Sequence, residues 1–331
     1  MRYKNILVTG GAGFIGSALI RYGLKELNIK TIVNLDALTY AANLYNLSSV
    51  ENDPRYHFVH GDICNETLVY EICKQHKIEA IIHCAAESHV DRSIASPKAF
   101  LDTNIYGTFC LLEVVKKLPH IHFHHISTDE VYGSVEEGLF DENSLYRPNS
   151  PYAASKAASD HLVRAWSHTF DLSVTLSHCT NNYGPYQHEE KFIPRMILNC
   201  LNKKPLTIYG TGYNVRDWIY VDDHAEAVWT ILDKGTSSEI YDIGGECEKK
   251  NLDVLDEIIS CVSHLTGETK SNLLSLVTFV SDRQGHDFRY AINCTKIKKE
   301  LSWSPAHSFS EALNETVAWY IDNLSQVERV L

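Results

Sequence analysis

A glycine-rich turn near the N-terminus constrains the fold more than any other feature of the sequence. The segment Gly10-Gly-Ala-Gly13-Phe-Ile-Gly16 follows an apolar run at residues 5–8 and opens a helical pattern. Its glycine spacing lets the backbone approach a pyrophosphate bound at the helix N-terminus. Asp36 ends the next apolar run twenty residues after Gly16, the spacing of an acid that binds a ribose. We therefore expect NAD rather than NADP, because an acid there repels a 2′-phosphate; a plain turn and a capping aspartate are the alternatives.

Apolar strand-like runs alternate with helical patterns through the first half of the chain. The runs lie at residues 5–8, 31–35, 57–60, 80–84, 120–127 and 172–177, and the helical patterns at 14–27, 66–76, 105–117 and 152–170. The runs are continuously apolar, which is typical of parallel strands that are covered on both faces. The pattern predicts an α/β fold, a Rossmann-type doubly wound parallel sheet with a smaller C-terminal substrate domain.

The composition of the segments changes after about residue 180. Loops rich in glycine, aromatic and charged residues follow at 183–186, 209–213 and 282–286, and such loops usually carry ligand contacts. We expect residues 1–180 to form the cofactor domain and residues 181–216 and 249–331 the substrate domain. Residues 217–248 are expected to return to the first domain, because 239–245 has the pattern of another buried strand.

Composition excludes several classes of partner. A net charge of -12 argues against nucleic acid and anionic membranes, which favour clustered Lys and Arg. No apolar stretch approaches the roughly 20 residues that a bilayer requires, and no signal-peptide pattern opens the chain. The nine cysteines form no C-x-x-C pair, and most lie in apolar segments, so we expect free thiols and a reducing cytoplasm.

Two short motifs carry the candidate chemistry. Ser127-Thr128-Asp129-Glu130 places a hydroxyl and two carboxylates at the end of an apolar run, and Tyr152 and Lys156 lie one helical turn apart. A Tyr/Lys pair suits proton removal from an alcohol as a hydride leaves, and the carboxylates suit a further acid–base step on neighbouring carbons. The combination predicts a dehydration. A Tyr-x-x-x-Lys pattern also occurs by chance in helices, where the two side chains only pack. The alternative role for the two carboxylates is to cap a loop.

Further cofactor contacts are expected at two strand ends. Asp62 and Ile63 follow the third run, where an adenine would lie, although an aspartate after Gly61 is also a common turn residue. Residues 85–88 follow the fourth run and would pass beside the middle of the cofactor.

The catalytic set resembles that of the short-chain dehydrogenases, and the whole chain resembles the extended branch of that family, which acts on nucleotide sugars. Within the branch it is most similar to the dTDP-glucose 4,6-dehydratases. The segments that carry this resemblance are 85–93, 127–133, 181–185, 216–224 and 282–287. The resemblance implies NAD, a nucleotide-sugar substrate and conversion of dTDP-glucose to a 4-keto-6-deoxy sugar. A UDP-glucose 4,6-dehydratase, a 4-epimerase, a decarboxylase and, more distantly, a non-catalytic NAD-binding protein are the alternatives.

The resemblance also assigns roles. Tyr152, helped by Lys156 and the positive nicotinamide, would accept the proton of the C4 hydroxyl, and Thr128 would hydrogen-bond the reacting oxygen. Glu130 would then take the C5 proton, and Asp129 would protonate the departing C6 hydroxyl. The implied cofactor contacts are Gly10, Gly13, Phe14, Ile15, Gly16, Asp36, Ala37, Leu38, Thr39, Asp62, Ile63, Ala85, Ala86, Ser88, Thr103, Tyr152, Lys156 and Asn182. The implied substrate contacts are Ser88, Thr128, Asn181, Lys191, Phe192, Thr207, Ile208, Tyr209, Arg216, Asn251, Arg283, His286 and Tyr290. Surface salt bridges are the alternative for the two arginines. Gln284 and Phe288 depart from the family pattern, which commonly has Pro and Arg there.

Two further expectations concern metals and assembly. Four clustered histidines are possible metal ligands: His120, His122, His124 and His125. The alternation of side chains along a strand explains them more simply, so we expect no metal. The helices at 105–117 and 152–170 carry more apolar residues than one sheet face needs: Phe109, Leu111, Leu112, Ala157, Leu162 and Trp166. The family pairs these helices as a four-helix bundle, which implies a homodimer.

Overall fold

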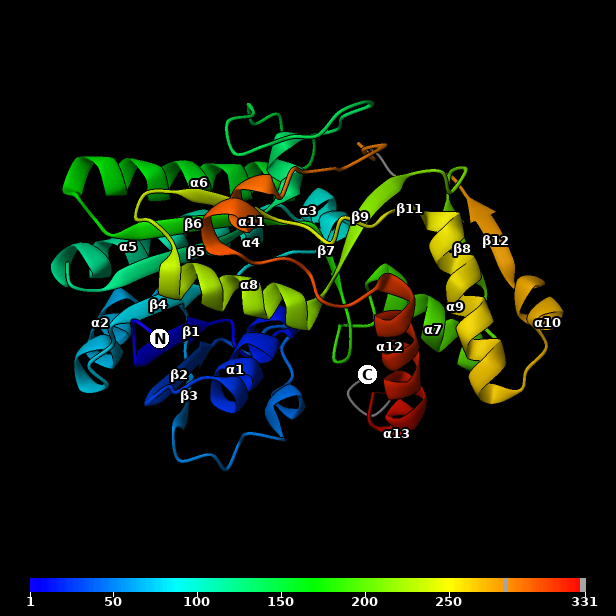
Figure 1. The fold of residues 1–331 in the computed structure, drawn as a ribbon, viewed down its shortest axis with the longest axis horizontal. Coiled ribbons are helices and arrows are strands. Elements are labelled where there is room, and N and C mark those ends of the chain that lie inside the picture. The colour runs from blue at the N-terminus through cyan, green and yellow to red at the C-terminus, as the bar shows by residue number, and fades with distance from the viewer. Residues whose placement is uncertain (283–284, 328–331) are drawn as a thin grey trace.

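The structure is a computed structural model that describes residues 1–282 and 285–327. A large α/β unit holds the N-terminal half, and a smaller unit lies beside it (Figure 1). The strands are β1 (Asn5–Thr9), β2 (Thr31–Asp36), β3 (Tyr56–His60), β4 (Ala80–His83), β5 (His122–Thr128), β6 (Val174–Cys179), β7 (Asn181–Tyr183), β8 (Leu206–Tyr209), β9 (Val215–Tyr220), β10 (Ile240–Ile243), β11 (Glu248–Lys250) and β12 (Val277–Val280).

The α-helices vary from single turns to twenty residues. They are α1 (Phe14–Glu26), α2 (Glu66–Gln75), α3 (Val90–Ala95), α4 (Lys98–Phe100), α5 (Thr108–Lys117), α6 (Pro151–Phe170), α7 (Phe192–Leu201), α8 (Val221–Lys234), α9 (Asn251–Thr266), α10 (Lys270–Leu274), α11 (Thr295–Leu301), α12 (Phe309–Asp322) and α13 (Leu324–Val327). Two 3₁₀ turns, η1 (Leu44–Leu47) and η3 (Asp129–Tyr132), and a π-helical segment, η2 (Leu101–Gly107), complete the set. Every helix in the described ranges is too short or too polar to cross a bilayer.

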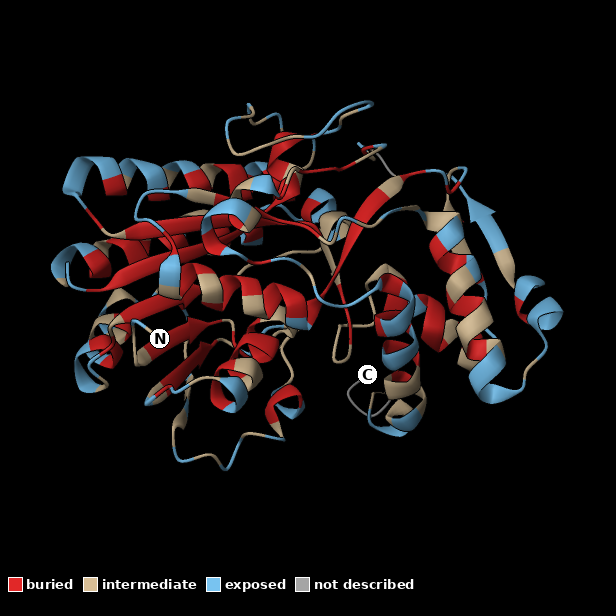
Figure 2. Cartoon of the chain, in the orientation of Figure 1, coloured by how far each residue is buried: buried red, intermediate tan, exposed pale blue. Residues whose placement is uncertain are grey.

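The large sheet confirms the predicted fold. Its seven strands run in the order β10-β6-β5-β4-β1-β2-β3, and all neighbours are parallel. Chain direction across the sheet reverses between β1 and β4, and such a switch point opens a crevice at the carboxyl ends of the strands. The strands are buried throughout most of their length (Figure 2), because helices cover both faces.

Alternate residues of each strand enter two different cores. Ile6 and Val8 pack with α1 and α8, and Leu7 between them packs with α2, α5 and α6 on the opposite face. Trp229 of α8 also donates its indole N–H to the Leu19 carbonyl of α1 at 2.9 Å. This two-sided burial explains why these strands have continuous apolar sequences.

The smaller unit has its own core between α7, α9 and α12. Two small sheets accompany it: β11-β9-β7, and the parallel pair β12-β8. The expected strand within residues 239–245 does return to the large sheet, where β10 pairs with β6. By contrast, β9 pairs with β7 and β11 outside that sheet, so residues 217–248 divide between the two units.

Candidate active site

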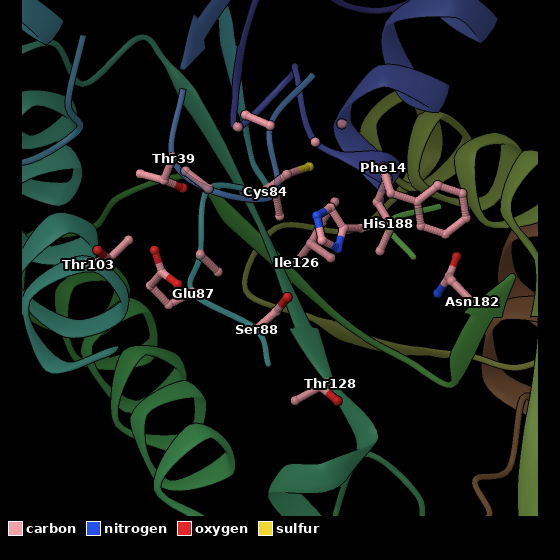
Figure 3. A pocket seen from close by; sticks show the side chains of 18 of the residues that line it. Phe14, Thr39, Cys84, Glu87, Ser88, Thr103, Ile126, Thr128, Asn182 and His188 are labelled. Atoms are coloured by element: carbon pink, nitrogen blue, oxygen red, sulfur yellow. The ribbon is translucent and has the colours of Figure 1, made fainter. Parts of the chain in front are cut away.

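A cavity of about 310 Å³ lies at the carboxyl ends of β1, β2, β4, β5 and β6. Figure 3 shows Phe14 and Asn182 at one end, Thr39 and Thr103 at the other, and Thr128 at the end of its strand. Most predicted site residues gather in its wall: Gly10, Gly13, Phe14, Ile15, Gly16, Asp36, Ala37, Thr39, Asp62, Ile63, Ala85, Ala86, Ser88, Thr103, Thr128, Asp129, Glu130, Tyr152, Lys156, Asn181, Asn182 and Lys191. Segments separated by up to about 180 residues therefore converge on one site.

The glycine turn fits a dinucleotide pyrophosphate. A Cβ on Gly10, whose φ is +70°, would lie 2.7 Å from the backbone of Ala85, and one on Gly16 would lie 2.2 Å from the Gly10 carbonyl oxygen. Among the described side chains none caps the N-terminus of α1, and its first turn carries no acid. The positive end of this helix is thus open toward an anion in the cavity.

Asp36 is fixed to this turn by its carboxylate. One oxygen accepts the Ala12 N–H and the other accepts the Leu38 N–H, both at 2.8 Å. Burial raises the pKa of Asp36, and the two backbone hydrogen bonds oppose that rise. Leu38 has a φ of +52° and an outward side chain that is 37% exposed, so its backbone amide supports Asp36 while its side chain stays outside the cavity wall.

The catalytic candidates meet where β5 ends and α6 begins. The Thr128 hydroxyl accepts the Glu130 N–H at 3.3 Å, donates to Asp129 Oδ1 at 3.4 Å and hydrogen-bonds the Tyr152 phenol. Ser150 caps α6 by accepting the Ala153 N–H at 3.1 Å, which fixes Tyr152 in the first turn.

The two adjacent carboxylates are held in different environments. Asp129 is 3% exposed, and burial, followed by the charge of Glu130, raises its pKa well above the usual range. Both effects favour the protonated form of Asp129, and Glu130 beside it is only half-buried. Such a separation lets one carboxyl group give a proton while the other takes one.

The surroundings of Tyr152 oppose the phenolate, which Lys156 and the nicotinamide are expected to favour. Burial and the charge of Glu130 raise the pKa of Tyr152 well above its usual value, and the hydrogen bond from Thr128 only partly opposes them. The Lys156 ammonium donates to the Ile126 carbonyl at 2.8 Å, and burial lowers its own pKa. The positive nicotinamide expected beside this pair is therefore the remaining source of phenolate stabilisation.

Several cavity residues were missed by the sequence interpretation. Glu87 lies within residues 85–93, which carry the family resemblance, so the sequence could have indicated it. No local sequence pattern marks His188 or Glu190 as cavity residues. The Tyr40 hydroxyl donates to Glu190 at 3.0 Å, and the Arg92 guanidinium lies 3.7 Å from the centre of the Tyr40 ring. This contact spans 150 residues and holds Glu190 of the cavity wall, so only the folded chain reveals it.

The remaining substrate candidates form a second group beyond the described cavity wall. Arg216 is 8% exposed, stacks 4.3 Å from the centre of the Tyr290 ring and affects the pKa of Asp129. Tyr290 donates to Asp287 at 2.6 Å, and Glu130 helps to raise its pKa. Arg216 and Tyr290 thus lie near the carboxylate pair.

The other members of that group are spread over the smaller unit. Thr207, Ile208 and Tyr209 belong to β8, Phe192 and Asn251 begin α7 and α9, and His286 contacts Asp282 at 2.6 Å. Arg283 and Gln284 lie outside the described residues. Phe288 has an exposed side chain, and its carbonyl accepts Arg216 Nη1 at 3.2 Å.

The strand histidines are explained by hydrogen bonds across the sheet. His122 contacts Ser173 and Thr175, and His124 contacts Thr175 and Ser177, at 2.8 to 3.2 Å. Burial lowers the pKa of His122 to about 4. The described part of the chain contains no group of three or more His, Cys, Asp or Glu residues arranged for a metal.

Comparison with known proteins agrees with this geometry. The model of the GDP-mannose 4,6 dehydratase family matches residues 7–316. A dTDP-glucose 4,6-dehydratase from Haemophilus influenzae is 50% identical over 97% of this chain and 99% of its own length. The chain belongs to the dTDP-glucose 4,6-dehydratase family.

Other relatives show the same family membership. A dTDP-glucose 4,6-dehydratase from Salmonella typhimurium is 48% identical over 98% of this chain and 95% of its own length. The crystal structure of a dTDP-glucose 4,6-dehydratase from Bacillus anthracis, in complex with NAD, is 45% identical and has a TM-score of 0.90. It covers 99% of this chain and 100% of its own. Family membership thus extends over the large sheet and the smaller unit alike.

Proposed function

We propose that this chain is an NAD-dependent lyase that converts dTDP-glucose to the 4-keto-6-deoxy sugar. The observation that carries the proposal is the buried Asp129 beside Glu130, at the end of β5 and next to the Thr128–Tyr152 pair. Oxidation or epimerisation at C4 needs only the tyrosine, whereas loss of water also needs an acid for C6 and a base for C5. Family membership and an NAD-bound relative support the same reaction.

The glycine turn and Asp36 would hold NAD, with its pyrophosphate at the N-terminus of α1. When bound, NAD supplies a hydride acceptor at C4 of the sugar and a hydride donor at C6. Tyr152 Oη takes the proton of the C4 hydroxyl, and Thr128 Oγ1 orients the two oxygens through its hydrogen bond to the phenol. Lys156 keeps a positive charge beneath this site.

Loss of water follows once C4 is a ketone, because only the ketone makes the C5 proton acidic. A Glu130 carboxylate oxygen takes the C5 proton, and the protonated Asp129 gives its proton to the departing C6 oxygen. Glu130 then returns a proton to C5. Arg216 and Tyr290 lie close enough to influence this pair, and they are proposed to hold the diphosphate side of the substrate.

The most direct test is to incubate the purified protein with dTDP-glucose and then add alkali, which gives 4-keto sugars a strong absorbance. Absorbance with dTDP-glucose is expected, and UDP-glucose run in parallel tests the choice of nucleotide. A 4-epimerase would yield the C4 epimer without accumulating a ketone, and a decarboxylase would need a carboxylated sugar. Accumulation of the epimer alone would overturn the proposal.

The proposal also assigns cofactor binding and substrate binding to different parts of the chain. Residues 1–180 together with the returning strand β10 are proposed to bind NAD, and residues 181–216 and 249–331 to bind the nucleotide sugar. Two observations support this division: the glycine turn lies in the large sheet, and the separate core of α7, α9 and α12 lies beside Arg216. A cytoplasmic location is also proposed, supported by the free-thiol state of all nine cysteines.

Asp36 is expected to set the preference for NAD over NADP. Asp36→Ser removes the charge that repels a 2′-phosphate and a charge-assisted hydrogen bond, so discrimination should fall by roughly 10–100-fold. Dissociation constants of both cofactors, measured by fluorescence with cofactor-stripped protein, provide the readout. Asp62→Asn lies in the same cavity wall and is the matched control. Tighter binding of NADP than NAD by the unaltered protein would refute this role.

A homodimer through α5 and α6 is proposed from an exposed aromatic row. Tyr106, Phe109, Trp166 and Phe170 contact one another in sequence, with ring centres 5.7 to 5.8 Å apart. Tyr106 of η2 is 54% exposed and Phe170 of α6 is 41% exposed, whereas Leu111 and Leu112 of α5 are fully buried against the sheet. The row thus adds apolar surface beyond what the sheet covers, and an isologous contact would bury it.

Light scattering is expected to give twice the 37.5 kDa chain mass at micromolar concentration. Tyr106→Glu should yield monomers, because it places a charge in the aromatic row, whereas Leu145→Glu, at a site that is 72% exposed elsewhere, should not. Since Tyr152 and Lys156 lie on α6, loss of the dimer should also lower activity. A fully active unaltered protein with the mass of one chain would contradict the dimer.

A further inference from the structure

A fully buried histidine lies between two carboxylates just behind the catalytic strand end. His178 of β6 has Nδ1 3.0 Å from Asp242 Oδ1 and Nε2 3.2 Å from Asp160 Oδ2. Each nitrogen also contacts a tyrosine hydroxyl, Tyr132 at 2.9 Å and Tyr146 at 2.8 Å. Carboxylate oxygens face both ring nitrogens, and a neutral imidazole would direct a lone pair at one of them. This geometry favours the doubly protonated, positive ring.

Asp160 connects this histidine to the catalytic lysine. It follows Lys156 by one turn of α6, accepts the Ser127 hydroxyl at 2.9 Å and lies 3.2 Å from His125 Nε2. His125 Nε2 is in turn 3.5 Å from the Lys156 ammonium, which donates to the carbonyl of Ile126, the neighbour of Ser127. Asp160 is thus linked to Lys156 through His125 and through the chain segment that joins Ser127 to Ile126.

The buried network has two basic members, Lys156 and His178, and two acidic members, Asp160 and Asp242. Burial raises the pKa of Asp242, and its hydrogen bond with His178 opposes that rise. The titratable and charged groups that face His178 or its partners come from each packed element: Asp160, His161 and Arg164 of α6, Asp242 of β10, Tyr132 of η3, His125 of β5, and Tyr146 and Glu142 of the loop before α6. A single uncompensated charge in such surroundings is costly, so loss of one member acts on the others.

We infer that His178 is a positioning residue, whose positive ring holds Asp160 in place and thereby aligns Lys156 for the reaction. The inference rests on the proposed role of Lys156. Burial disfavours the charge of His178, but its hydrogen bonds to Asp160 and Asp242 outweigh burial and raise its pKa to about 9. Hydrogen bonds from His125 and His178 keep the pKa of Asp160 below its usual range despite burial.

This arrangement predicts a specific response to pH. As pH rises through about 9, His178 loses a proton, and its new lone pair repels one of the two carboxylates. Because the folded pKa lies above the ordinary value of 6.5, the stability that this charge provides is complete below pH 6.5 and is lost as pH rises through about 9. Activity should decline over the same upper limb because Asp160 and Lys156 lose their alignment.

The experiment compares His178→Asn, Asp242→Asn and the double variant with the unaltered protein. His178→Asn leaves Asp242 without its positive partner, so its melting temperature and its kcat at pH 8 should fall, kcat by roughly tenfold or more. The double variant replaces the His178–Asp242 pair by two neutral amides, which should restore part of the melting temperature, but it still leaves Asp160 without the positive ring, so kcat should stay low. It should also lack the decline of kcat near pH 9 that the unaltered enzyme shows. His124→Asn, a fully buried histidine held by Thr175 and Ser177 hydroxyls, is the matched control and should keep that decline.

The same decline in the double variant as in the unaltered enzyme would overturn the inference. So would additive losses in melting temperature, because they would show that the two positions do not act as a pair. If a variant fails to fold, ¹⁵N spectra of the unaltered protein decide the point, since both ring nitrogens of His178 should carry protons at pH 7.5 and a neutral tautomer would contradict the inference. Absence of dehydratase activity in the unaltered protein would instead refute the proposed function.

Discussion

Glu130→Gln is expected to stop the loss of water while leaving oxidation at C4 intact. Glutamine keeps the size of the side chain but cannot take the C5 proton, so turnover should fall by about 10²–10⁴-fold. Quenching with borodeuteride and mass spectrometry should still detect a C4 ketone that retains its C6 hydroxyl. In D₂O the C5 position of that sugar should keep its protium, because the base is missing.

Asp129→Asn should give a different result at the same stage. Glu130 remains, so C5 should exchange with solvent deuterium, but without the buried acid the C6 hydroxyl leaves slowly and turnover again falls by about 10²–10⁴-fold. Glu136→Gln, on the exposed loop after η3, is the control for an added amide and should retain turnover. Near-normal turnover in either dyad variant would show that the acid and base are assigned wrongly.

Tyr152→Phe is expected to abolish the first step. Phenylalanine keeps the edge contact with Phe100, whose ring centre lies 6.3 Å away, but removes the oxygen that accepts the C4 hydroxyl proton. Neither a C4 ketone nor exchange at C5 should appear, and turnover should fall by about 10²–10⁴-fold.

A buried tyrosine outside the site provides the matched control for that change. Tyr183 is 1% exposed, and its hydroxyl donates to the Phe309 carbonyl at 3.3 Å within the smaller unit. Tyr183→Phe should retain C4 oxidation even if it lowers the melting temperature slightly. Exchange at C5 in Tyr152→Phe would contradict the order of steps, because the C5 proton becomes acidic only after C4 is oxidised.

The sequence was sufficient for features that depend on local spacing. The glycine turn, the acid that ends β2 and the Tyr152–Lys156 pair all follow from short-range geometry, and continuous apolar runs indicated the parallel sheet. The extent of the helix before β5 was less predictable. It was expected at residues 105–117, but η2 and α4 extend it back to residue 98. Asn104 in η2 holds both backbone groups of Glu87 with its side chain, a tertiary contact that no local pattern reveals.

Protonation states and long-range contacts were beyond the sequence. The raised pKa of Asp129 depends on burial beneath elements that fold from both units, and adjacent carboxylates alone do not show which one is the acid. The pKa of Tyr152 likewise depends on burial and on the charge of Glu130, which the sequence does not show. Asp160, His178 and Asp242 come from α6, β6 and β10, so their contacts become visible only when α6 packs on the sheet in which β6 and β10 are neighbours.

Isotope tracing of the reaction in D₂O tests the central claim most directly. With unlabelled dTDP-glucose, the product should carry solvent deuterium at C5, where Glu130 returns an exchangeable proton. Its C6 methyl group should carry none, because the hydrogen added there originates from C4 of the same sugar. Solvent deuterium in the C6 methyl group would contradict the account.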